Sequence, residues 1–138
     1  MQLDASVHAC ALRADGSAVC WGDARHGQLG DSSAAFRATP FDVAGTTDAV
    51  ALDVGYDHAC AVRAGGEVRC WGGNFYGQLG NGGTVGVGTP VAVSGLAGAR
   101  VLATGVFHSC AGTDTGAWCW GRGFLGTGRA AGARPRSP

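Results

Sequence analysis

The residues of this sequence with the most chemical potential are its cysteines, which form three pairs, each with a histidine two positions before its first cysteine. Sulfur and imidazole in this arrangement can form disulfide bonds, bind a metal ion, or lie reduced in a protein core. The three sets are His8, Cys10 and Cys20; His58, Cys60 and Cys70; and His108, Cys110 and Cys119.

The spacing within each pair predicts a β-hairpin with the two cysteines face to face. Alternating runs flank Ala14-Asp15-Gly16, a three-residue loop whose glycine suits a left-handed third position. With this loop, Cys10 lies opposite Cys20 on a non-hydrogen-bonded pair, where Cα atoms approach to about 4.5 Å and a disulfide can form.

The other two pairs follow the same rule. A three-residue loop at Ala64-Gly65-Gly66 places Cys60 opposite Cys70. In the third set the cysteines are one residue closer, and a two-residue loop at Asp114-Thr115 restores the pairing of Cys110 with Cys119. Asp-Thr is a poor two-residue turn, so this hairpin is the weakest of the three. Three disulfides within hairpins is the favoured interpretation.

Two alternatives remain open for the cysteines. His8, Cys10 and Cys20 share a strand face in the hairpin and offer three ligands to zinc. Against zinc, the spacing is unlike common zinc motifs, and no fourth ligand recurs at a fixed place. The other alternative is reduced cysteines acting as small core residues.

Composition and motifs predict that the chain is not an enzyme and holds no cofactor. No Ser-His-Asp arrangement or carboxylate pair stands out, and the Gly-Gln-Leu-Gly loops lack the pattern of phosphate-binding loops. Ten arginines balance ten acidic residues, with no run of like charge before the tail, so no nucleic-acid surface is expected. No run approaches the ~18 apolar residues that span a bilayer, so no membrane insertion is expected.

The elements that position the cysteines repeat at a period of fifty residues, which marks a repeat architecture. Glycines separate short apolar runs, which predicts three to four short strands per copy and no helix. Tryptophan lies on the hairpin face opposite the cysteines, so both faces are apolar and each hairpin is expected to stack between neighbours. The histidines are expected to tie down loops. The repeated structural residues are His8, His58, His108, Trp21, Trp71, Trp120, Gly30, Gly80 and Gly126.

The copies divide the chain into four predicted segments. Residues 1–45 are repeat 1, incomplete on its N-terminal side, and residues 46–96 are repeat 2. Residues 97–128 are a truncated repeat 3, and residues 129–138 carry no apolar pattern and are expected to be a disordered tail.

The order Gly-x-x-His-x-Cys-Ala, Cys-Trp-Gly, Gly-Gln-Leu-Gly, then Pro and Val resembles the regulator of chromosome condensation repeat, over residues 1 to about 128. In that family each repeat is one β-propeller blade. The resemblance implies an all-β fold of tandem four-stranded antiparallel blades, here a partial arc of about three. Because three blades do not close a ring of the usual 4 to 8, a fragment, a decayed gene or self-association through open blade edges is expected.

The resemblance implies a non-catalytic module that binds a protein partner through its blade loops. The alternatives are a guanine nucleotide exchange factor-like regulator of a small GTPase, and a secreted inhibitor similar to the β-lactamase inhibitor protein. The paired cysteines resemble an exported bacterial branch, and the absence of lysine suggests a GC-rich bacterial genome. Disulfides favour an extracytoplasmic location, secreted, periplasmic or at the cell surface, whereas free thiols favour the exchange factor. The N-terminus has no pattern of a signal peptide.

Overall fold

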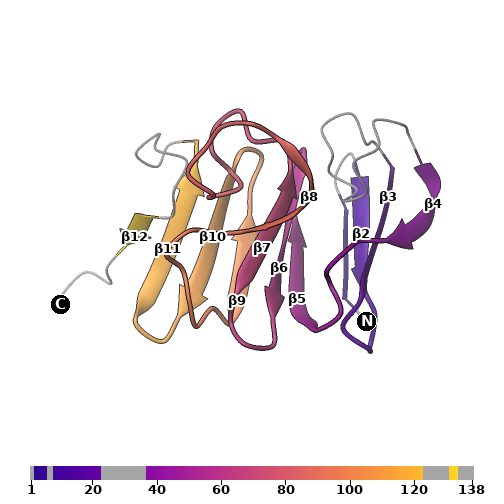
Figure 1. Ribbon diagram of the computed structural model, residues 1–138, viewed down its shortest axis with the longest axis horizontal. Coiled ribbons are helices and arrows are strands. Elements are labelled where there is room, and N and C mark those ends of the chain that lie inside the picture. The colour runs from indigo at the N-terminus through magenta and orange to yellow at the C-terminus, as the bar shows by residue number, and fades with distance from the viewer. Residues whose placement is uncertain (1, 6–7, 23–36, 123–130, 134–138) are drawn as a thin grey trace.

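The computed structural model describes residues 2–5, 8–22, 37–122 and 131–133, and in this part of the chain every regular element is a strand (Figure 1). The strands form three antiparallel sheets of four, which follow one another in chain order along the long axis of the molecule. The prediction of tandem four-stranded antiparallel sheets is therefore confirmed. Within the described ranges, no helix is long and apolar enough to cross a membrane.

Each sheet is a simple meander in which every strand pairs with its neighbours in sequence. The first sheet consists of β1 (Gln2–Ala5), β2 (His8–Leu12), β3 (Ala18–Gly22) and β4 (Arg37–Asp42). The second consists of β5 (Ala49–Val54), β6 (His58–Arg63), β7 (Val68–Gly72) and β8 (Val87–Ala92). The third consists of β9 (Val101–Thr104), β10 (His108–Thr113), β11 (Gly116–Gly121) and β12 (Ala131–Ala133).

The predicted registers of the three central hairpins are confirmed, because in each one the two cysteines lie directly opposite each other. Gly16 and Gly66 have φ angles of 88° and 89°, the left-handed conformation that the three-residue loops require. In the third hairpin, Thr113 supports the poor turn. Its Oγ1 accepts a hydrogen bond from the Thr115 amide at 3.2 Å and donates one to the Gly116 carbonyl at 3.1 Å.

The sulfur atoms of each cysteine pair lie at disulfide bonding distance. The separations are 2.06, 2.11 and 2.12 Å in the first, second and third hairpins, and the Cα atoms of each pair are 4.1 Å apart. Among the described residues, no group of three or more His, Cys, Asp or Glu side chains is arranged to hold a metal ion.

The first and last strands of the described chain complete the outer sheets. In the first copy β1 pairs with β2, and in the third copy β12 pairs with β11 as a fourth strand. Residues 131–133 are therefore not part of a disordered tail, while the rest of 129–138 lies outside the described residues. Edge strands pair through main-chain groups, which the alanines and glycine of β12 supply without any side-chain pattern that could predict the strand. The exact segment boundaries stay predictions.

The sheets stack so that the cysteine face of one packs against the tryptophan face of the next. Trp71 from the second sheet and Trp120 from the third are fully buried, each in a cluster with the preceding sheet. The first cluster joins Cys10, Leu12, Ala18 and Cys20 to Leu52, Val54, Ala59 and Trp71. The second joins Cys60, Val62, Val68 and Cys70 to Ala111 and Trp120.

The cysteine faces differ in how well they are covered. The four cysteines of the first two sheets are fully buried, whereas Cys110 and Cys119 are only half-buried. The third sheet has no following sheet over its cysteine face within the described part of the chain.

We therefore expect limiting dithiothreitol to reduce Cys110–Cys119 first, because thiol–disulfide exchange needs access for the attacking thiolate. Alkylation at successive times, followed by peptide mass mapping, measures the order. The two buried pairs are the internal controls, and equal labelling rates at all three pairs would contradict the burial pattern.

Candidate protein-binding surface

The loops that lead into the second strand of the second and third sheets are tight turns between a glycine and a histidine. The Gly55 amide donates to the His58 carbonyl at 2.8 Å, and the Gly105 amide donates to the His108 carbonyl at 2.9 Å. A Cβ on Gly55 would lie 2.3 Å from His58 Cε1 and 2.6 Å from the Gly105 carbonyl oxygen. The histidine ring therefore packs directly on the glycine, which explains the repeated Gly-x-x-His spacing.

Each turn displays apolar side chains at the same end of the sheets. Tyr56 is 44% exposed and Val106 is 56% exposed, while Asp57 is turned inward and buried. Because the two turns occupy equivalent places in adjacent sheets, their exposed residues come from neighbouring blades.

The β7–β8 loop reaches the same end and is shaped by two buried amide side chains. Asn74 Oδ1 accepts from the Leu79 amide at 2.9 Å, and its Nδ2 donates to the Val85 carbonyl at 3.0 Å. Gln78 Oε1 accepts from the Tyr76 amide at 2.9 Å. The buried amides hold the loop backbone in place of regular pairing, so the residues between them project outward.

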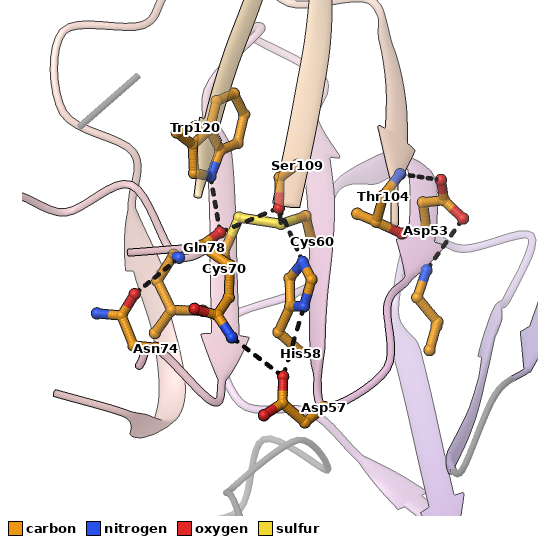
Figure 2. Close-up of a disulfide and its surroundings, with 12 residues drawn as sticks. Asp53, Asp57, His58, Cys60, Cys70, Asn74, Gln78, Thr104, Ser109 and Trp120 are labelled. Atoms are coloured by element: carbon orange, nitrogen blue, oxygen red, sulfur yellow. Dashed lines mark hydrogen bonds and ion pairs between the residues drawn. A yellow bond between two sulfur atoms is a disulfide. The ribbon is translucent and has the colours of Figure 1, made fainter. Parts of the chain in front are cut away.

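The same loop is fastened to the third sheet by hydrogen bonds to the Gln78 carbonyl, shown in Figure 2. Trp120 Nε1 donates to this oxygen at 2.7 Å, and Ser109 Oγ donates to it at 3.0 Å. The serine oxygen lies 2.8 Å from His58 Nε2, so the ring donates to it through Nε2–H. Gln78 Nε2 donates to Asp57 Oδ1 at 3.2 Å, which joins the loop to the Gly55 turn.

The exposed side chains at this end form a continuous aromatic cluster. The ring centroids of Tyr76 and Phe107 lie 4.8 Å apart, those of Tyr56 and Phe107 5.7 Å apart, and those of Phe75 and Tyr76 5.0 Å apart. Phe75 is 79% exposed. The Arg122 guanidinium lies 5.1 Å from the centre of the Tyr76 ring. We define the aromatic loop surface as Tyr56, Phe75, Tyr76, Val106, Phe107 and Arg122.

This composition is that of a protein interface core, where aromatic residues and arginine are enriched and most other charges depleted. The surface stands on a rigid support, because the Arg122 amide donates to the Phe107 carbonyl at 2.9 Å and the loops beneath are held by buried amides.

The predicted repeat residues that the structure describes lie in the three sheets and in the β7–β8 loop. His8 and His58 are buried and His108 is half-buried, while Trp21 is partly buried. Gly80 has a φ of 70°, and a Cβ there would lie 2.9 Å from Trp120 Cδ1. Gly30 and Gly126 lie outside the described residues.

Sequence reasoning missed the aromatic loop surface. The available signal was contrast between the copies: Phe75-Tyr76 stands where the first copy has Arg25-His26, inside an otherwise repeated stretch. Large aromatic residues at positions that change between copies, next to positions that do not, indicate exposure.

Comparison with known protein families identifies the repeat from which the three sheets are built. One model described as the regulator of chromosome condensation (RCC1) repeat matches residues 6–28 and 49–78, and a second such model matches residues 65–111. The chain belongs to the RCC1 repeat family. A comparison with curated protein sequences gave no match.

Solved structures share the fold at low sequence identity. Human WBSCR16 superposes with a TM-score of 0.84 at 21% identity over 98% of this chain, and yeast RCC1 (Prp20), solved bound to Kap60, with 0.74 at 23% identity over 89%. The ectodomain of the Physcomitrella patens receptor kinase CR4 superposes with 0.54 at 22% identity over 87%. This chain spans 38%, 30% and 29% of those chains.

Replacement of Gly55 tests the packing beneath the surface. We expect Gly55→Ala to lower the free energy of unfolding by about 1–3 kcal/mol, because the added methyl group must displace the His58 ring. Gly65→Ala is the matched control, since a Cβ there meets nothing within 4 Å, and its effect should stay within about 0.5 kcal/mol. Urea unfolding followed by tryptophan fluorescence gives both values, and equal effects would contradict the packing.

Proposed function

We propose that this chain is a non-catalytic module that binds a protein partner through the aromatic loop surface. The observation that carries the proposal is the exposure of Tyr56 and Phe75 in one ring cluster on a buried hydrogen-bonded frame. Val106, in the turn equivalent to that of Tyr56, adds a further exposed apolar side chain. Exposed apolar side chains that gather in a patch cost solubility without a partner, and such patches mark interaction sites.

The solved structures with this fold support the proposal of a protein-binding module. Yeast RCC1 (Prp20), which shares the fold, was solved bound to another protein, Kap60. The same fold forms the ectodomain of the receptor kinase CR4, and this supports a role outside the cytoplasm.

The cysteine pairs favour an extracytoplasmic module over a cytosolic exchange factor. Three pairs of sulfur atoms lie at bonding distance, and persistent disulfides require an oxidising compartment. These distances support the proposal of a secreted, periplasmic or cell-surface location, with the partner in the same compartment.

Selection from a phage-displayed library of random 12-residue peptides tests the proposal with the full chain as target. Peptides that bind should lose at least about tenfold in affinity for Phe75→Ser/Val106→Ser, because that variant removes the two most exposed apolar side chains of the surface.

The matched control is Val50→Ser/Val101→Ser, which changes two valines that are 58% and 63% exposed. They lie at the N-terminal ends of β5 and β9, whereas the turns of the aromatic loop surface follow the C-terminal ends of these strands. Peptides should bind this variant as they bind the unchanged protein. If no selected peptide distinguishes the two double variants, the aromatic loop surface is not the binding site.

A further inference from the structure

Arg122 differs in its surroundings from the other arginines whose side chains the structure describes. Four of these arginines are paired with carboxylates in their own sheets. The pairs are Arg13 with Asp42, Arg63 with Asp48 and Glu67, Arg69 with Glu67, and Arg100 with Asp114.

In each pair the guanidinium and the carboxylate form a salt bridge. Hydrogen bonding from Arg63 holds the pKa of Asp48 below its ordinary value, and hydrogen bonding first from Arg69 does the same for the pKa of Glu67. The carboxylates of Asp48 and Glu67 are thus already paired with arginines of their own sheet.

Arg122 has no carboxylate partner among the described residues. Its side chain is exposed and lies over the Tyr76 ring, while its main-chain amide donates to the Phe107 carbonyl. An aromatic face holds a guanidinium by cation–π attraction and leaves the N–H edge available for further hydrogen bonds.

The rings around this cation also determine what a ligand must carry. The rings of Phe75 and Phe107 contact the Tyr76 ring under the guanidinium, so apolar area adjoins the cation. Tyr56 extends this area through its contact with Phe107. A ligand that covered only the rings would bury the guanidinium without a hydrogen-bond partner, which is costly. A ligand that brought only a carboxylate would leave the rings in water.

We propose that the aromatic loop surface binds a segment of its protein partner that carries a carboxylate beside a large apolar side chain, with the carboxylate on Arg122 and the apolar side chain on the rings. The arginine's planar edge suits two parallel hydrogen bonds to a carboxylate. The inference rests on the proposed function, since it specifies the ligand of the same surface.

The carboxylate has two possible sources, an Asp or Glu side chain and the C-terminus of a chain. Selected peptides are synthesised in three forms to distinguish them: with a free C-terminus, with a C-terminal amide, and with each Asp or Glu replaced by Asn or Gln. Loss of binding on amidation identifies a C-terminal carboxylate, and loss on side-chain replacement identifies an acidic residue.

Arg122→Gln tests the pairing by isothermal titration calorimetry with these peptides. We expect Kd to rise about tenfold for the carboxylate-bearing peptide, and the preference for it over its amide analogue to disappear in the variant. Binding should also weaken as salt rises from 50 to about 300 mM in the unchanged protein, and less so in the variant.

Arg100→Gln is the matched control, because Arg100 is an exposed arginine that already pairs with Asp114 at 2.9 Å. It should bind every peptide as the unchanged protein does. If peptides depend on Phe75 and Val106 but bind Arg122→Gln and the amide analogues unchanged, the inference is overturned and the proposed function stands. If no peptide depends on Phe75 and Val106, the proposed function itself fails.

Discussion

The structure depends on one main-chain oxygen, the carbonyl of Gln78, where the second and third sheets are joined. It accepts hydrogen bonds from Trp120 Nε1 and Ser109 Oγ, and Ser109 in turn is held by His58. The residues involved are fully buried, so each bond is made without competition from water. The cysteine pairs do not supply this connection, because each lies within a single hairpin and spans nine or ten residues. They fix strand pairing, whereas tryptophan packing and the Gln78 carbonyl hold neighbouring sheets together.

The repeated and the unrepeated residues have separate tasks in this arrangement. Positions that recur between copies, such as Gly55 and His58 with Gly105 and His108, make the turns and fill the space beneath them. Tyr56 occupies the same place in its turn as Val106 in the next, and both point to solvent. Changing those residues alters the surface without disturbing the frame, which is how one fold serves unrelated partners.

The sequence was sufficient to predict features that depend on local spacing. Strand alternation and loop length placed Cys10 opposite Cys20, and the shorter third loop still opposed Cys110 to Cys119. Strand parity also placed the tryptophans on the face away from the cysteines. The strand β12 was not expected because its pairing uses backbone groups, with no periodic side-chain signal. The aromatic loop surface was missed for a different reason.

That surface is assembled from segments far apart in the chain. Tyr56, Tyr76 and Phe107 come from three loops of two sheets and meet only when the sheets are stacked. The role of the Gln78 carbonyl could not be predicted either. A sequence repeat identifies a recurring side chain such as Trp120, but not the main-chain atom to which that side chain donates a hydrogen bond.

The measurement that bears most directly on the joint between the sheets is the free energy of unfolding of Ser109→Ala. Removing the hydroxyl takes one donor from the Gln78 carbonyl and leaves the buried His58 Nε2–H without its acceptor, so a loss of about 1–3 kcal/mol is predicted. Ser94→Ala, at an exposed serine, should change it by less than about 0.5 kcal/mol. If Ser109→Ala unfolds at the same urea concentration as Ser94→Ala, the Gln78 carbonyl is not what holds the sheets together.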